Sequence, residues 1–255
     1  MYGIILAAGR GERMGHLTDN TPKPMLRIND KPILQYQIEQ LKAGGITNIM
    51  IVEKYLSKVI KDYFKDGKEF GVKIDHLVIE GEKGSAGALR EALQSIPEQE
   101  KDVVLMYGDI FSDVDIARLL KKHQETGEND ATLLEVNMDN LIPNGIIDAK
   151  DIDEDGIFKN KGIEKPSEVG MWGHGAIFAL NRNRMLKNLP ESGDLSKDVW
   201  ARLYDTLRLG FYNHEGYWRN MTSPSDLSQV EKDIKHRLSG VNKENNISPS
   251  TSERK

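Results

Sequence analysis

A glycine-rich segment near the amino end carries residue types that can bind phosphate. Small side chains leave the backbone open to a ligand, and free N–H groups after a strand can bind phosphate oxygens. Arg13 follows, and a guanidinium can contact two oxygens of one phosphate group. Taken alone, the segment is equally typical of a tight strand-to-helix turn. The residues concerned are Leu6, Ala7, Ala8, Gly9 and Gly11.

A lysine between two prolines comes shortly afterwards, in Pro22-Lys23-Pro24. Each proline fixes its own φ and disfavours the helical conformation in the residue before it. The segment therefore predicts a rigidly presented cation. Arg13 and Lys23 together would suit a polyphosphate, because arginine binds two oxygens and lysine acts as a point charge.

Two further segments place polar or small groups next to predicted elements. Gly108-Asp109 directly follows an apolar run, and open α/β sheets place their chemistry at the carboxyl ends of strands. The small residues Gly84, Ser85, Ala86 and Gly87 precede a helical pattern and could contact a flat ring through backbone groups. The structural alternatives are a solvated aspartate and an N-cap formed by Ser85.

The elements that must position these residues alternate between strand and helix. This alternation predicts an α/β fold: a Rossmann-like, mostly parallel central sheet with helices on both faces, plus a small antiparallel substrate-binding subregion. We expect strands at 2–8, 48–52, 72–77, 102–107, 131–136 and 175–179, and helices at 31–43, 56–64, 87–96, 114–124, 196–207 and 224–238.

The amino-acid composition of the chain changes after about residue 140. Glycine, aspartate and asparagine become frequent, which predicts short strands and turns on the same sheet. We expect residues 1–238 to form one catalytic domain. Residues 239–255 lack hydrophobic periodicity and are predicted to be a disordered tail.

Composition excludes several classes of protein. The 255 residues contain no cysteine, which excludes disulfide scaffolds, thiolate metal sites and cysteine nucleophiles. The formal net charge of −5 argues against nucleic acid as the main partner. No apolar run is long enough to span a membrane, and the amino end does not resemble a secretory signal. We therefore expect a cytoplasmic protein with no membrane partner.

Two familiar nucleotide loops fit poorly. The P-loop pattern is absent, and Met14 stands where a dinucleotide-binding loop has its third glycine. Instead, LAAGRGERMGHLTDNTPKPMLRINDKPIL resembles the opening signature of the sugar-1-phosphate nucleotidyltransferases, the NDP-sugar pyrophosphorylases. The resemblance covers about residues 2–235, and the chain looks like the short form without a C-terminal β-helix.

This resemblance implies a Mg²⁺-dependent enzyme that joins a nucleoside triphosphate and a sugar 1-phosphate, releasing pyrophosphate. It assigns catalysis to Arg13, Lys23 and Asp109, and base recognition to the Gly84–Gly87 block. Asp109 and Asn220 correspond to the metal ligands, although Asn220 stands where the family has aspartate. The implied sugar-phosphate site comprises Gly145, Glu164, Lys165, Trp172 and Gly175.

Other functions stay open at this point. A cytidylyltransferase acting on phosphocholine or another phosphoalcohol would use the same chemistry, with an aromatic box for the ammonium group. A regulatory protein that binds nucleotide without turnover is a further alternative. A dinucleotide-dependent dehydrogenase would leave Pro22-Lys23-Pro24 without a role. The nucleobase and the sugar are not encoded in recognisable residue types, and a homo-oligomer stays open.

Overall fold

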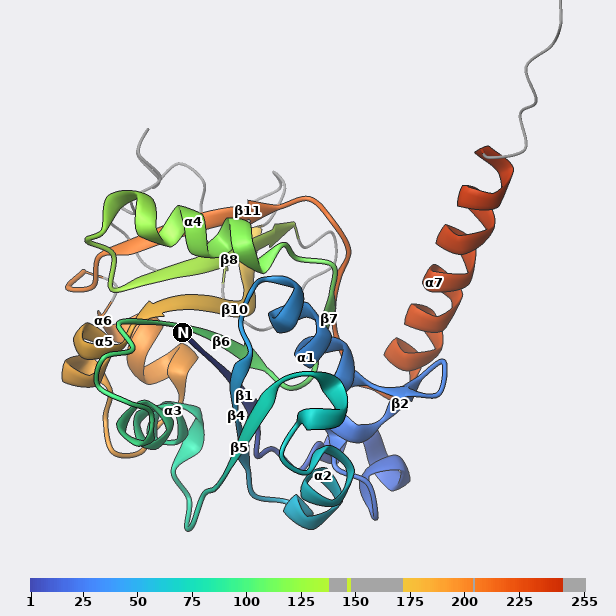
Figure 1. Cartoon of the computed structure of the whole chain (residues 1–255), viewed down its shortest axis with the longest axis horizontal. Coiled ribbons are helices and arrows are strands. Elements are labelled where there is room, and N and C mark those ends of the chain that lie inside the picture. Colours follow the sequence, from blue (N-terminus) through green and yellow to red (C-terminus); the bar gives the residue numbers. More distant parts are fainter. Residues whose placement is uncertain (138–145, 148–171, 204, 245–255) are drawn as a thin grey trace, which may run out of the picture.

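A computed structural model describes residues 1–137, 146–147, 172–203 and 205–244 (Figure 1). Their centre is an eight-stranded sheet with the order β11-β8-β10-β6-β1-β4-β5, in which β9 pairs with β10. Most neighbouring strands are parallel, so the predicted fold class is confirmed. The strands are β1 (Tyr2–Ala7), β4 (Asn48–Glu53), β5 (Lys73–Val78), β6 (Asp102–Tyr107), β8 (Ala131–Asn137), β9 (Ile146–Ile147), β10 (Trp172–Asn181) and β11 (Leu209–His214).

The antiparallel part of the sheet centres on β10. This strand lies between β6 and β8 and runs antiparallel to both. Its pairing with β8 shifts register between His174 and Phe178. Two small antiparallel pairs lie outside the main sheet, and they join β2 (Arg27–Ile28) to β3 (Lys31–Pro32) and β7 (Ile110–Ser112) to β12 (Trp218–Asn220).

Helices cover both faces of the sheet and bury a hydrophobic layer on each (Figure 1). Leu34 of α1, Phe64 of α2 and Leu119 of α4 belong to one layer. Leu89 of α3 and Met185 of α5 belong to the other. The helices are α1 (Ile33–Ala43), α2 (Ser57–Phe64), α3 (Gly84–Ser95), α4 (Ile116–Thr126), α5 (Arg182–Asn188), α6 (Ala201–Leu203) and α7 (Pro224–Glu244).

The observed helices differ by a few residues from the predicted bounds, and two of the differences have a local cause. Helix α1 begins at Ile33 and not at Lys31, because Lys31 and Pro32 pair with β2. The helix predicted over 196–207 is instead a π-helical segment, η5 (Leu195–Trp200), followed by α6. The side chain of Asp194 caps η5 by accepting hydrogen bonds from the first backbone N–H groups.

Helix α7 extends away from the body of the molecule (Figure 1). Near its start, Val230 packs in a third hydrophobic cluster with Met14, Ile28 and Met221. The boundary expected at 238 falls inside this helix, which continues to Glu244. The division into a catalytic domain and a tail stays a prediction. Residues 245–255 lie outside the described residues. Among the described helices, none is both long and apolar enough to cross a membrane.

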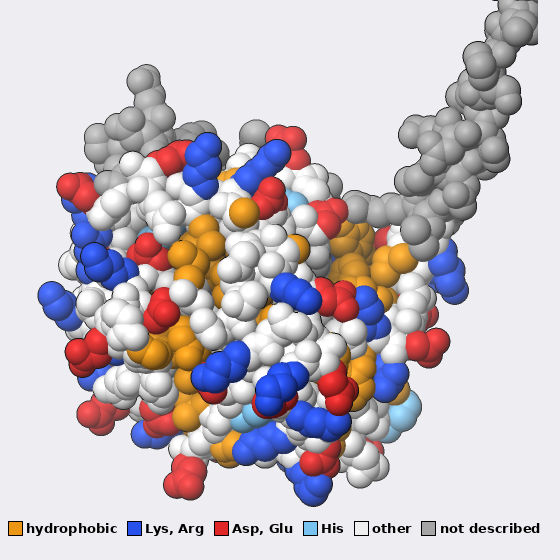
Figure 2. Space-filling model, in the orientation of Figure 1, with side chains coloured by type: hydrophobic (Ala, Val, Ile, Leu, Met, Phe, Trp, Pro, Cys, Tyr) orange, Lys and Arg blue, Asp and Glu red, His pale blue; other side chains and the backbone are white. Residues whose placement is uncertain are grey.

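The surface seen in Figure 2 mixes lysine and arginine with aspartate and glutamate and shows no area of a single charge. Among the described residues, Met1 and Val78 are the large hydrophobic side chains classed as exposed. Strands β1, β4, β5 and β6 are mutually parallel. Their carboxyl ends therefore meet at one edge of the sheet, where open α/β folds bind ligands.

Candidate active site

A cleft of about 1030 Å³ opens at this edge of the sheet. The loops that follow β1, β4, β5 and β6 line it together with the start of α3. Most residues predicted to bind nucleotide or to act in catalysis lie here. They are Leu6, Ala7, Ala8, Gly9, Gly11, Arg13, Lys23, Gly84, Ser85 and Asp109.

The two glycines of the first loop serve different purposes. A Cβ on Gly9 would meet no atom within 4 Å, so the space beside its backbone is open to a ligand. Gly11 has a φ of +72°, and a Cβ there would lie 2.8 Å from Cβ of Lys23. Gly11 is therefore required both by its left-handed backbone and by the close approach of Lys23.

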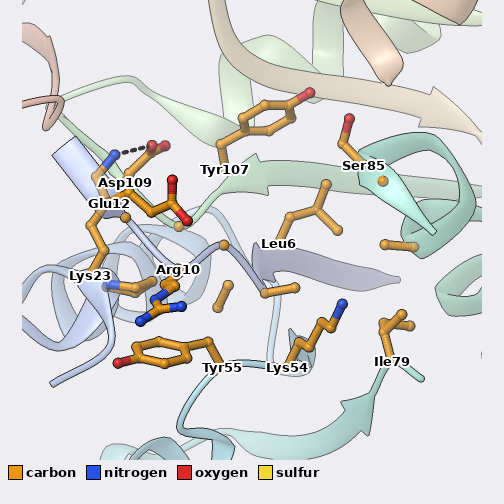
Figure 3. A pocket seen from close by; sticks show the side chains of 18 of the residues that line it. Leu6, Arg10, Glu12, Lys23, Lys54, Tyr55, Ile79, Ser85, Tyr107 and Asp109 are labelled. Atoms are coloured by element: carbon orange, nitrogen blue, oxygen red, sulfur yellow. Dashed lines mark hydrogen bonds and ion pairs between the residues drawn. The ribbon is translucent and has the colours of Figure 1, made fainter. Parts of the chain in front are cut away.

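Lys23 is a buried cation at the wall of the cleft. Met25 donates a backbone hydrogen bond to Pro22, and this turn forms the short 3₁₀ helix η2 (Lys23–Met25). The Lys23 side chain is 10% exposed, and its Nζ lies 2.6 Å from Oδ2 of Asp109 (Figure 3). The two charges, 86 residues apart in the chain, thus form an ion pair.

The turn that carries Asp109 is held from two sides. Gly108 donates a backbone hydrogen bond to Leu6 at 2.9 Å, and Asp109 accepts one from Met221 at 2.8 Å. A Cβ on Gly108 would lie 2.9 Å from the Leu6 carbonyl oxygen, so glycine permits the close contact between this turn and β1. The Asp109 side chain stays 27% exposed to the cleft.

Asn220, the second predicted metal ligand, lies on β12 beside the residue that follows Asp109. It pairs with Ile110 in the β7–β12 ladder, one residue from the Asp109–Met221 hydrogen bond. Its side-chain oxygen is buried and accepts no hydrogen bond from a described residue. Mg²⁺ prefers oxygen ligands and needs few protein carboxylates, so an aspartate and an amide oxygen are suitable ligand types. Asp109 lines the cleft, whereas Asn220 is not among the lining residues. No cluster of three or more acidic or histidine ligands occurs within the described part of the chain.

Several lining residues were missed by the sequence analysis. Arg10 lies over the ring of Tyr55, with its Cζ 5.4 Å from the ring centroid (Figure 3). Lys54 pairs with Glu82 and donates to the carbonyl of Gly81, which joins the loops after β4 and β5. The signal that could have found these residues is their position directly after two parallel strands.

The Gly84–Gly87 block is divided between cleft and core. Gly84 and Ser85 line the cleft, whereas Ala86 is fully buried and donates its N–H to the Gly193 carbonyl at 2.9 Å. A Cβ on Gly87 would collide with the carbonyl oxygen of Glu191, so this glycine is required by packing. The assignment of Ala86 and Gly87 to nucleotide binding is therefore not supported by their position.

The sequence suggested that Ser85 caps its own helix, but its side chain does not do so. Its hydroxyl donates to Asp194 at 3.2 Å and accepts from the backbone N–H of Leu195 at 2.8 Å. Ser85 thus ties the start of α3 to the start of η5. The hydroxyl of Tyr107 points toward Ser85 (Figure 3), and burial raises the pKa of this phenol, so it stays a neutral group.

Only some of the predicted sugar-phosphate residues belong to the described part of the chain. Gly145, Glu164 and Lys165 lie outside the described residues. Trp172 starts β10, and its backbone pairs with Asn137 and Ile147. Gly175 is buried in β10, where a Cβ would lie 2.6 Å from Leu134, and its carbonyl accepts a hydrogen bond from Trp218. Packing, and not contact with the cleft, explains Gly175.

A second acid lies at the same edge, on β8. Glu135 is 6% exposed, and its Oε1 is buried without a hydrogen bond from the described residues. Burial raises the pKa of this carboxyl to about 7. Glu135 pairs in register with His174 of β10, which is also buried. Neither position was singled out as a binding residue from the sequence.

Comparison with known proteins identifies the family. A family model described as nucleotidyl transferase matches residues 2–237. The chain belongs to the nucleotidyl transferase family. The resemblance stated from the opening signature is thereby confirmed.

Two curated members of the nucleotidyl transferase family illustrate the similarity. A mannose-1-phosphate guanyltransferase of Debaryomyces hansenii is 28% identical over 231 residues, which are 89% of this chain and 62% of that protein. The chain thus spans less than two thirds of that relative. A D-glycero-α-D-manno-heptose 1-phosphate guanylyltransferase of Campylobacter jejuni is 32% identical over 169 residues, covering 64% of this chain and 72% of that protein.

A solved structure confirms the fold. HddC from Yersinia pseudotuberculosis, crystallised with GMP-PN, superposes with a TM-score of 0.75. The match covers 91% of this chain and 99% of that one at 20% sequence identity. The sheet and its helices are therefore shared.

Proposed function

We propose that this protein transfers a nucleotidyl group from a nucleoside triphosphate to a sugar 1-phosphate, giving an NDP-sugar and pyrophosphate. The observation that carries the proposal is the meeting of the glycine loop, Arg13, Lys23 and Asp109 in one cleft. Membership in the nucleotidyl transferase family supports it independently.

The reaction needs no nucleophile from the protein. An oxygen of the acceptor phosphate attacks the α-phosphorus and forms the new P–O bond. The bond from the α-phosphorus to the oxygen that bridges to the β-phosphorus breaks, and its electron pair leaves with pyrophosphate. Catalysis then consists of positioning and charge stabilisation.

The residues of the cleft suit these tasks. Backbone groups of the loop between Leu6 and Gly11 bind the triphosphate beside the open space at Gly9. Arg13 is exposed at the cleft and contacts the phosphate tail. Lys23, whose Nζ lies beside Asp109 at the wall of the cleft, stabilises the negative charge that grows on the leaving pyrophosphate.

Asp109 and Asn220 are the residues that would hold Mg²⁺. The unpartnered amide oxygen of Asn220 beside the Asp109 turn supports this assignment. When bound, the ion supplies positive charge that stabilises the phosphate oxygens during transfer. Because Asn220 is neutral, the protein provides one negative charge where two aspartates would provide two.

The named relatives guide the choice of substrates. Both act by name as guanyl or guanylyl transferases on 1-phosphates of mannose or of a manno-configured heptose. GTP with a manno-configured sugar 1-phosphate is therefore the first pair that we propose for this chain.

Phosphocholine is the weaker acceptor candidate. A quaternary ammonium group needs open aromatic faces. Within the sheet, Phe178 of β10 stacks on Trp200 with ring centroids 5.1 Å apart, and these residues are 0% and 3% exposed. Their faces are covered by each other and by neighbours, so this described aromatic group offers no open box.

The test is a matrix of five nucleoside triphosphates against sugar 1-phosphates and phosphocholine, with Mg²⁺, read as pyrophosphate release. We expect the highest rate with GTP and mannose 1-phosphate or a manno-configured heptose 1-phosphate. A maximum with phosphocholine would replace the sugar by a phosphoalcohol. Tight nucleotide binding with no pyrophosphate from any acceptor would contradict the proposal and favour a regulatory protein.

A further inference from the structure

We propose that Gln37 of α1 is a positioning residue for Asp109. Gln37 is 2% exposed, and its side-chain amide lies beneath the turn between β6 and β7. Its Nε2 donates to the carbonyl of Tyr107 at 2.7 Å and to the carbonyl of Ile110 at 2.8 Å. These two carbonyls flank Gly108-Asp109 on either side.

The geometry makes Gln37 a clamp across the turn. A primary amide has two N–H donors, and Gln37 uses both on carbonyls that are three residues apart. The Oε1 atom of Gln37 is buried and accepts no hydrogen bond from a described residue. The polar interactions of this side chain with the described chain are thus directed to the turn.

The clamp complements the backbone contacts of the same turn. The backbone N–H of Gly108 donates a hydrogen bond to Leu6 of β1, and the carbonyl of Asp109 accepts one from Met221, which follows β12. Gln37 adds a tie from the helix layer, so the turn is fixed from three directions. The direction of the Asp109 carboxylate toward Lys23 depends on this turn, because the side chain has few rotatable bonds of its own.

Gln37 does not line the cleft, so it would act only through Asp109. The inference rests on the proposed function, which places Asp109 in catalysis. Nucleotide binding relies mainly on the loop after β1, which Gln37 does not contact through a hydrogen bond. Loss of the clamp should therefore lower turnover more than it weakens the binding of nucleotide.

The chain offers a matched control one turn later on α1. Gln40 also uses its Nε2 twice, donating to Ser112 Oγ at 3.2 Å and to the Val114 carbonyl at 2.8 Å. These acceptors lie at the far end of β7, away from Asp109. Gln37→Met and Gln40→Met each remove two hydrogen bonds of similar kind and keep side-chain length.

The experiment compares both variants with the wild type by pyrophosphate release, by thermal melting, and by NMR hydrogen exchange of the Gly108 and Met221 amides. We expect Gln37→Met to lower kcat at least tenfold, with KM for the nucleotide within about twofold, and to speed exchange of both amides at least tenfold. Gln40→Met should keep kcat and both exchange rates within about twofold. Gln37→Asn, a milder change, should give an intermediate loss and serves if Gln37→Met does not fold.

Unchanged exchange at Gly108 and Met221 in the Gln37 variants would overturn the inference. So would equal losses of kcat in the Gln37 and Gln40 variants at equal loss of melting temperature, because both glutamines would then serve stability alone. If the wild type released no pyrophosphate with any substrate pair, the proposed function would fail. The exchange measurement would still decide whether Gln37 holds the turn.

Discussion

Two acidic side chains at the same edge of the sheet have opposite surroundings. Asp109, after β6, is 27% exposed and lies 2.6 Å from the Nζ of Lys23. Glu135, on β8, is 6% exposed, and its Oε1 accepts no hydrogen bond from the described chain. Burial raises the pKa of Glu135 to about 7.

The difference separates the two halves of the edge. On the side of the cleft, the carboxylate of Asp109 lies beside the Lys23 ammonium group and is partly exposed to solvent, which favours its charged form. On the β8 side, the charged form of the acid loses its hydration without a comparable gain. The charge on Glu135 therefore depends on pH near neutrality, and this half of the molecule should respond to pH through stability.

The largest effect is expected from removing the counter-charge of Asp109. Lys23→Ala should lower kcat for pyrophosphate release by about 100- to 1,000-fold, since loss of one preorganised group costs about 3–4 kcal/mol of barrier. The control is Lys58→Ala, which removes an exposed lysine paired with Asp62 on α2 and should leave turnover unchanged. Near-wild-type turnover in Lys23→Ala would show that the Lys23–Asp109 pair does not act in catalysis.

An intermediate effect is expected from replacing the other acid. Because the pKa of Glu135 is raised to about 7 in the folded protein, the folded state binds more protons than the unfolded state between about pH 4.5 and pH 7. Stability should therefore fall as pH rises through this window, by on the order of 3 kcal/mol. Glu135→Gln should remove this fall and melt at a higher temperature than the wild type at pH 8.

Melting curves from pH 4.5 to pH 8 check this expectation. Glu125→Gln is the matched control, because Glu125 is half exposed and pairs with Lys122 on the surface of α4. It should retain the pH dependence of the wild type. Identical pH profiles for Glu135→Gln and the wild type would show that the carboxyl is not desolvated.

A smaller effect is expected from adding an acid beside Asp109. Asn220→Asp should lower the Mg²⁺ concentration needed for half-maximal activity by about tenfold, or ~1.4 kcal/mol, because a second carboxylate strengthens the site. Asn213→Asp makes the same change at an exposed position of β11 and should not alter the requirement. An unchanged Mg²⁺ requirement in Asn220→Asp would remove this residue from the metal site.

Sequence patterns predicted much of the fold, and the errors have local causes. Apolar runs placed β1, β4, β5 and β6 to within one residue at each end, because buried parallel strands read as continuous hydrophobic segments. The short strands β2, β3 and β7 were not predicted. The start of α1 was misplaced because Lys31 and Pro32 pair with a two-residue strand that has no periodicity. The π-helical segment η5 was read as an ordinary helix because its apolar residues also suit helical spacing.

The candidate site was predictable where one short segment carries it. The glycine loop, Lys23 between prolines and the Gly108-Asp109 turn could be read locally, since their conformations follow from glycine and proline. Lys54 and Tyr55 were missed because neither belongs to such a segment. Their position in the cleft follows from the order of strands in the sheet.

The sequence by itself determined which groups this protein could offer to a nucleotide, because residue type fixes charge, hydrogen-bonding capacity and backbone freedom. The tertiary structure decided which groups meet. It brought Lys23 into contact with Asp109, placed Gln37 in hydrogen bonds to the Gly108-Asp109 turn, and buried Glu135. Such meetings depend on strand order and register across many tens of residues, and no local pattern encodes them.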